Sequence, residues 1–184
     1  MLDFQQSRDA FPAFIKMHQD RVYNVVLGML QNQQDAEEIT QDVFIEVYRK
    51  ASAFKGDSSI STWLYRIAVN KSIDHLRSKQ RKKRFGIIIN LFHPQSNEAV
   101  HEPRHFVHPG VVSENKEKAK YLFTAIKSLP ENQQTAFVLN EMEQLSYKDI
   151  SEVMETTVSA VESLLIRAKQ NLRKRLADFY KENL

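Results

Sequence analysis

The chain has 184 residues, no cysteine and a formal net charge of +3, which allows one domain or two small ones. Without cysteine it has neither a disulfide framework nor a thiolate metal site. No apolar run is long enough to span a membrane and Met1–Phe4 lacks the start of a secretory signal, so we expect a soluble, cytoplasmic protein without direct membrane insertion.

Apolar residues at helical spacing predict a first helical module over residues 1–84. Its first helix has an apolar stripe that contains Phe11, Phe14, Ile15, Val22, Val25, Val26 and Met29. The second begins at the capping sequence Asp35–Glu38 and continues to about Phe54. Its outer face is acidic and polar. Such a face is either a solvated helix surface or a docking site for a basic partner.

A small polar loop over residues 54–61 precedes a third helix, which we expect from about Thr62 to Arg84. Residues 66–84 contain eight basic residues and one acid, a local charge of +7 in a chain whose total is +3. Charge concentrated in this way indicates a polyanion-binding surface. The spacing of Trp63 favours burial in the core, although an aromatic ring beside basic residues is also typical of single-strand binding.

Residues 85–112 show no helical period and contain three prolines and four histidines, which predicts a flexible linker. The linker opens with an apolar run, residues 85–92. This run is either buried, as an extension of the preceding helix, or a docking segment for a partner. The histidines are irregularly spaced and no cysteine assists them, so we expect no metal and no cofactor.

The second module, residues 113–184, ends in two helix-start signals thirteen positions apart. In Ser146–Asp149 and Ser159–Glu162, a serine hydroxyl can accept from the amide three residues on while the acid reaches back. The signals predict a short helix over about Tyr147–Met154, a tight turn, and a longer helix from Ser159 to about Phe179. This order is that of a helix-turn-helix.

Phased at ~100° per residue, the longer helix buries one apolar stripe. The stripe contains Val161, Leu165, Ala168, Leu172, Leu176 and Phe179. The opposite face carries short polar residues around Ile166, with arginines on its flanks. An apolar side chain among polar ones suits the major groove, where it can contact a thymine methyl. A solvated basic face is the plainer interpretation of the same pattern.

Four motifs in sequence then resemble extracytoplasmic-function (ECF) sigma factors of the sigma-70 family. Residues 35–44 resemble the polymerase-binding region 2.2, and residues 61–70, with Asp74, Leu76 and Arg77, are similar to the promoter-melting and −10-reading regions. Leu129–Pro130 and residues 136–139 resemble region 4.1. The two capped helices resemble the helix-turn-helix of region 4.2. The resemblance implies an all-α fold of two small modules, sigma region 2 and sigma region 4, joined by the linker.

The resemblance also implies roles for particular residues. Binding to core RNA polymerase, at the β′ clamp helices, is implied for Asp35, Glu38, Gln41, Asp42 and Glu46. Contact with the −10 element is implied for Lys55, Ser58, Ser59, Ser61, Asn70, Lys71, Arg77, Lys79 and Arg81. Reading of the −35 element is implied for Ser159, Glu162, Ser163, Ile166, Arg167, Gln170 and Arg173. The implied partners are core polymerase, including its β subunit, promoter DNA and an anti-sigma factor.

Two positions depart from the family pattern. Glu162 stands where Lys or Arg is frequent, and Leu164 stands where Arg is frequent. A carboxylate can accept from a cytosine amine, so Glu162 either reads a base edge or serves only as the capping residue of Ser159.

Two other classes of function are alternatives for this sequence. A stand-alone helix-turn-helix regulator explains residues 113–184 but not the acidic helix, polar loop and basic helix of the first module. No phosphate-binding glycine loop, nucleophile elbow or HExxH motif is present, so we expect no enzyme and no catalytic residue.

Overall fold

The computed structural model describes residues 9–92 and 116–182, with side chains described for residues 9–83 and 118–177. The first module contains α1 (Ala10–Leu30), α2 (Gln33–Lys50), a short 3-10 turn (Ala51–Ala53) and α3 (Ile60–Phe92). The second contains α4 (Lys116–Lys127), α5 (Glu131–Glu141), α6 (Tyr147–Val153) and α7 (Val158–Glu182). No strand occurs in these ranges, and the predicted all-α fold is confirmed.

Three helices begin at other residues than the sequence patterns predicted. Asn32, not Asp35, caps α2, because its side-chain oxygen accepts from the Asp35 amide at 2.9 Å. The cap of α7 is Thr157, whose hydroxyl accepts from the Ala160 amide at 3.1 Å, so the predicted capping box at Ser159 is wrong. Ser59 caps α3, which begins at Ile60, two residues ahead of the predicted start at Thr62. Each segment offers several capping residues in series, and local chemistry alone does not choose among them.

The start of α6 is as predicted. The Ser146 hydroxyl accepts from the Asp149 amide at 3.1 Å, and the same hydroxyl donates to the Asp149 carboxylate at 2.6 Å. The carboxylate therefore reaches back to the serine side chain instead of the serine amide. This cap fixes the first turn of a helix of seven residues, which is too short to be stable without packing.

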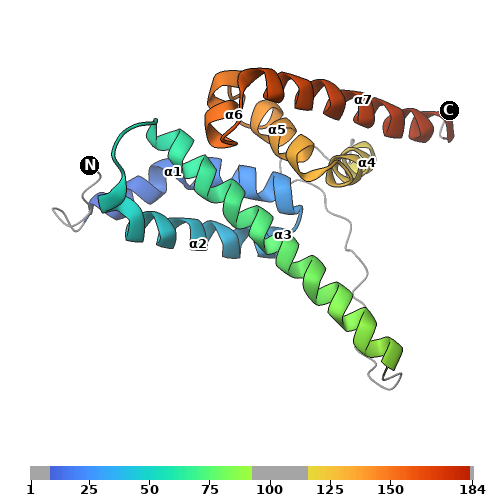
Figure 1. Cartoon of the computed structure of the whole chain (residues 1–184), viewed down its shortest axis with the longest axis horizontal. Coiled ribbons are helices and arrows are strands. Elements are labelled where there is room, and N and C mark those ends of the chain that lie inside the picture. The colour runs from blue at the N-terminus through green and yellow to red at the C-terminus, as the bar shows by residue number, and fades with distance from the viewer. Residues whose placement is uncertain (1–8, 93–115, 183–184) are drawn as a thin grey trace.

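Helix α3 continues to Phe92, well beyond the bundle that its first half joins (Figure 1). The first eight residues of the predicted linker, 85–92, are therefore a helical extension of the basic segment. The rest of that linker, with Pro94 and the four histidines, lies outside the described residues. None of the described helices is both long enough and apolar enough to cross a membrane.

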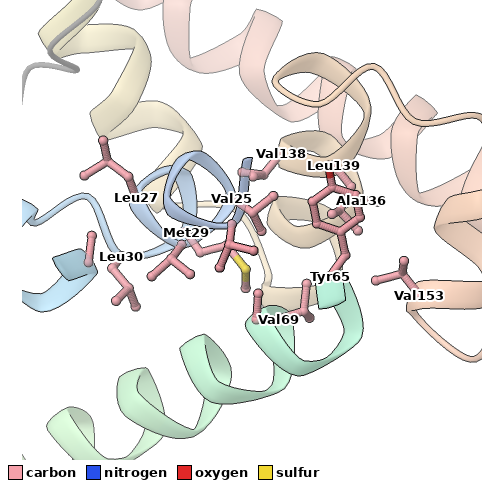
Figure 2. Close-up of a cluster of buried hydrophobic side chains, with 14 of the residues drawn as sticks. Val25, Leu27, Met29, Leu30, Tyr65, Val69, Ala136, Val138, Leu139 and Val153 are labelled. Atoms are coloured by element: carbon pink, nitrogen blue, oxygen red, sulfur yellow. The ribbon is translucent and has the colours of Figure 1, made fainter. Parts of the chain in front are cut away.

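One continuous apolar core joins the two modules. Figure 1 shows α1, α2 and α3 on one side and α4 to α7 on the other, with α1 against α5 and α3 against α6 at the junction. Figure 2 shows side chains from both modules meeting there, among them Val25 and Tyr65 from the first and Val138, Leu139 and Val153 from the second. The two modules therefore pack against each other and share a buried apolar interface.

We expect replacement of Leu165 by alanine to lower the free energy of unfolding by ~2–5 kcal/mol, because the buried side chain leaves a cavity. Leu165 is 2% exposed on the inner face of α7. Denaturant unfolding followed by circular dichroism measures the change. Leu122→Ala, at a side chain that is 37% exposed, is the control and should cost under ~1 kcal/mol. Equal losses in the two variants would contradict this assignment of the core.

Candidate nucleic-acid and polymerase interface

The outer face of α7 is free for recognition. Its inner stripe, Val161, Leu165, Ala168 and Leu172, is buried as predicted. All seven residues assigned to −35 reading are exposed: Ser159, Glu162, Ser163, Ile166, Arg167, Gln170 and Arg173. Ile166 is 51% exposed, although isoleucine is usually buried. With Thr157 as the cap, Ser159 lies inside α7, and Glu162 is exposed in the second turn of the helix.

The loop before α3 contains a glycine turn and ends at a side-chain cap. Gly56 has a φ of +82°, a conformation that favours glycine. At the other end, the Ser59 hydroxyl caps α3 and lies 2.8 Å from the Thr62 hydroxyl. Lys55 and Ser59 are exposed, while Ser58 and Ser61 are half-buried. The loop therefore presents a positive charge and hydroxyls next to a capped helix start.

Trp63 packs inside the first module, as the spacing favoured. It is half-buried against the core, and its ring lies 5.0 Å from that of Phe54 at a 41° angle. The contact joins the end of the 3-10 turn to the first turn of α3 and so braces the loop between them.

Some polar and basic residues of α3 are exposed to solvent, and others are paired with acidic side chains. Asn70 and Arg81 are exposed. Lys71 lies 4.0 Å from Glu46. Arg77 makes a two-point contact with Glu131 of α5, and the Lys79 ammonium lies 2.5 Å from the Asp35 carboxylate. Part of the predicted −10 surface is thus already paired with acids of this chain.

Of the residues assigned to polymerase binding, some are accessible and others are paired with basic side chains. Glu38 and Gln41 are exposed and Asp42 is half-buried, and these three lie together on α2. Asp35 instead lies between Lys79 and His75, whose ring nitrogen is 3.5 Å away. Glu46 accepts from Lys50 at 2.8 Å, and this contact lowers the pKa of the Glu46 carboxyl.

Sequence reasoning missed an apolar groove of about 540 Å³ beside Gln41. Phe11, Ile15, Phe44, Ile45 and Tyr48 line it, together with the polar residues Gln19, Thr40, Gln41 and Arg49. Ile45 and Tyr48 are about half exposed. Their spacing of four and seven residues from Gln41, on a face otherwise polar, was the available signal.

A buried polar contact between the modules was also missed. The Tyr65 hydroxyl donates to the Glu143 carboxylate at 2.7 Å, and the Glu143 side chain is 5% exposed. Burial raises the pKa of Glu143, although Tyr65, Arg21 and Asn24 favour its charged form. Burial, and then the neighbouring Glu143, also raise the pKa of Tyr65.

The described residues contain no group of three or more metal-ligating side chains placed to hold an ion. The arrangement combines a helix-turn-helix whose outer face is exposed, a basic helix beside a polar loop, and a polar helix beside an apolar groove. Surfaces of these kinds are typical of proteins that bind other macromolecules.

Comparison with known proteins assigns both modules. The sigma-70 region 2 model matches residues 14–82, and the sigma-70, region 4 model matches residues 119–172. The chain belongs to the ECF sigma factors of the sigma-70 family. It is 31% identical to the RNA polymerase sigma-H factor of Pseudomonas aeruginosa over 173 residues, 94% of this chain and 89% of that one. It is 30% identical to the ECF sigma factor SigW of Bacillus subtilis over 175 residues, which are 93% of this chain and 91% of SigW.

Two solved structures share the fold of this sigma factor. The sigma factor RpoE of Bartonella quintana, solved with the anti-sigma factor NepR, has a TM-score of 0.70 at 18% identity, covering 92% of this chain and 98% of that chain. CnrH, solved with the cytosolic domain of CnrY, has a TM-score of 0.67 at 17% identity. The match covers 94% of this chain and 90% of the CnrH chain.

The match to both regions decides between a sigma factor and a stand-alone regulator. A stand-alone helix-turn-helix regulator accounts for region 4 alone, whereas the relatives match across both modules. The protein is an alternative sigma factor. Sigma factors are transcription initiation factors and not enzymes.

We expect Glu143→Gln to stabilise the fold at neutral pH and to have no such effect in acid. Glu143 has a folded-state pKa above its ordinary value near 4.5, so ionisation as the pH rises disfavours the folded state. Below about pH 4.5 both states are protonated and the cost vanishes. Unfolding of both proteins between pH 4 and pH 8 measures this. If the gain in stability of the Glu143→Gln variant over the unmodified protein shrinks as the pH rises, the pKa of Glu143 is not raised in the folded state.

We expect Tyr65→Phe to destabilise the fold by ~1–3 kcal/mol at pH 7, because it leaves the buried Glu143 carboxylate without its hydroxyl donor. Tyr23→Phe is the control, since Tyr23 is a half-buried tyrosine on α1 that packs against the same core. Chemical denaturation of both variants measures the difference. Similar losses would mean that the Tyr65 hydroxyl contributes nothing particular.

Proposed function

We propose that this sigma factor binds core RNA polymerase in the cytoplasm through the exposed polar face of α2, melts and reads a −10 element with the loop and α3, and reads a −35 element with α7. The observation that carries the proposal is the outer face of α7, where an exposed Ile166 stands among short polar side chains on a helix that is buried along its other side. Such a face fits a major groove better than it fits water.

Polymerase binding rests on Glu38, Gln41 and Asp42, which are accessible together on α2. A carboxylate-and-amide face complements a basic partner helix, and the apolar groove beside Gln41 supplies surface to bury on contact. This pairing of an apolar pocket with a polar rim supports the β′ clamp helices as the partner, with the β subunit as a second contact for region 4.

Melting of the −10 element requires a flipped base to be held, at a cost of a few kcal/mol for unstacking. Lys55 and Ser58 provide a cation and a hydroxyl on a loop that the Ser59 cap and the Phe54–Trp63 contact hold in place, and Ser61 adds a hydroxyl from the first turn of α3. A loop held in this way loses little conformational entropy on binding. Asn70, Lys71 and Arg77 on α3 then face the duplex edge of the element, with Lys79 and Arg81 beyond them.

An anti-sigma factor is the further partner that we propose. Both solved neighbours, RpoE and CnrH, are seen with a protein of that kind or with the CnrY cytosolic domain. The apolar groove and the exposed polar residues beside it offer a surface on which such a partner excludes polymerase.

Run-off transcription tests the whole proposal. Purified core polymerase is supplied with a genomic promoter library, with and without this protein, and the transcript starts are sequenced. Starts that depend on the protein and share two elements at one spacing are expected. Specific DNA binding by the protein alone, without new starts, would contradict the proposal.

We expect Asp42→Ala to weaken binding to core polymerase about tenfold, the equivalent of ~1.4 kcal/mol for one interface contact. Gln34→Ala is the matched control, an exposed α2 residue outside the proposed contact. Fluorescence anisotropy of labelled protein titrated with core enzyme measures both affinities. Equal affinities of the two variants would remove Asp42 from the interface.

We expect Glu162→Gln and Glu162→Lys to change the preferred base at one position of the −35 element. A carboxylate accepts from a cytosine amine, whereas an amide pairs with adenine and an ammonium with guanine, each with ~1–3 kcal/mol of discrimination. Transcription from a panel of −35 variants measures the preference. An unchanged preference in both proteins would show that Glu162 reads no base.

A further inference from the structure

The last part of α3 leaves the helical bundle. Ile73 and Leu76 pack against the core as partly buried residues, and after Leu76 no described side chain of α3 belongs to that core. Residues 80–83 are exposed one after another. Four consecutive residues make more than one full turn, so the helix is open to solvent on every side at this point. Figure 1 shows this end of α3 extending away from the other described helices.

Beyond this point the helix continues through an apolar run. Residues 85–92 belong to α3, carry no charge and include one polar side chain, that of Asn90. At ~100° per residue, the six large apolar residues lie on an arc of ~200°, with Gly86 and Asn90 together on the opposite side. An apolar arc of this width requires a nonpolar environment. No other described helix runs beside it to provide one (Figure 1).

A basic cluster directly precedes the apolar run. Residues 81–84 are all Lys or Arg, and no acid occurs anywhere between positions 75 and 92. Arg81, Lys82 and Lys83 are exposed, whereas Lys79 is paired with Asp35. Lys82 and Lys83 fall on the side of the helix opposite the apolar arc. This is the pattern of a basic amphipathic helix, which is typical of binding to a membrane surface.

A partner has to match both parts of this segment. Nucleic acid accounts for the basic cluster through its phosphates, but it leaves the isoleucines of the apolar run in water. An anionic lipid surface places negative headgroups directly beside an apolar layer, and so it complements both parts at once. Residues 85–92 measure ~12 Å along the helix axis, far less than a membrane span requires. The helix therefore fits along the interface instead of across the bilayer.

We propose that residues 80–92 form an interfacial helix that binds the surface of a membrane containing anionic lipids. The apolar arc enters the outer part of the acyl layer, and the basic cluster lies among the headgroup phosphates. The binding is peripheral and reversible, because the apolar run is short and the attraction of its charges is screened by salt. This inference goes beyond the proposed function and depends on neither the polymerase contact nor the −10 contact.

Two double variants test the apolar arc. Ile88→Gln with Phe92→Gln places two glutamines one turn apart within the arc. Gly86→Gln with Asn90→Gln is the matched control, because it places two glutamines at the same spacing on the opposite side. Neither pair changes the net charge. All four positions lie beyond Leu76, so thermal unfolding of the bundle should be the same in both variants.

The first measurement is co-sedimentation of the full chain with vesicles of phosphatidylglycerol and phosphatidylcholine. Ile88→Gln/Phe92→Gln should weaken binding about tenfold or more, because two apolar residues of the arc are replaced by polar ones. Gly86→Gln/Asn90→Gln should leave it within about twofold of the unmodified protein. Equal binding of the two variants, or no binding by the unmodified protein, overturns the proposal.

The same assay tests the basic cluster. Lys82→Gln/Lys83→Gln should weaken binding to the anionic vesicles at least about tenfold, because each lysine near such a surface contributes about fivefold. Vesicles of phosphatidylcholine alone should bind the unmodified protein weakly, and added salt should release it from the anionic ones. Binding that is indifferent to lipid charge and to salt would contradict the role of the basic cluster.

The second measurement locates the segment that meets the lipid. The chain has no cysteine, so an environment-sensitive fluorophore can be attached at Leu91→Cys, on the apolar arc, or at Gln34→Cys, an exposed position of α2. Anionic vesicles should shift the emission of the Leu91→Cys label to shorter wavelength and leave that of the Gln34→Cys label unchanged. A shift at both positions or at neither overturns the proposal.

A protein contact is the competing explanation of the apolar run. If the unmodified protein ignores vesicles while Ile88→Gln/Phe92→Gln loses affinity for core polymerase and the control pair does not, the arc binds protein and the membrane proposal is wrong. The vesicle measurements contain neither polymerase nor DNA. Their failure therefore leaves the proposed function untouched, and an absence of run-off starts leaves the membrane proposal to these data.

Discussion

The close approach of α1 and α5 at Gly28 is the constraint on which the rest of the structure depends. Any side chain at this position would meet Met142 and Val138. The helices touch there, the apolar core runs unbroken from region 2 into region 4, and Tyr65 of α3 is buried in the same core. Glycine costs a helix interior up to ~1 kcal/mol relative to alanine, which the packing of two modules offsets.

The buried polar contacts give this junction its specificity. Apolar surfaces alone tolerate many relative placements, whereas a hydrogen bond between groups cut off from water is lost if either module shifts. Tyr65 with Glu143, and Gln134 with the Met29 carbonyl, each join residues far apart in the chain. Burial raises the pKa of the Glu143 carboxyl, although the Tyr65 hydroxyl and Arg21 favour its charged form. The junction thus has a definite geometry set by buried polar groups.

The helices and their inner faces were predictable, because an apolar stripe at helical spacing is a local property of the sequence. Val161, Leu165 and Ala168 are buried as the phasing required. The caps were less predictable, since Thr157 competes with Ser159 and the backbone decides between them. The contacts between modules were beyond local reasoning. Glu143 is as good a surface residue as Glu141 by sequence, and only the fold separates a buried carboxylate from an exposed one. A glycine inside the α1 pattern was the one local sign of a close approach.

The surfaces proposed for polymerase and for DNA differ in how far the second module covers them. Glu38, Gln41 and the groove beside them are accessible with the modules packed together. The outer face of α7 is accessible as well. On α3, by contrast, Arg66 lies beside Glu155 and Arg77 is paired with Glu131, both acids of the second module. Of the three proposed surfaces, that of α3 is therefore the one that the contact between the modules partly occupies, because the groups that would meet DNA phosphates already have carboxylate partners.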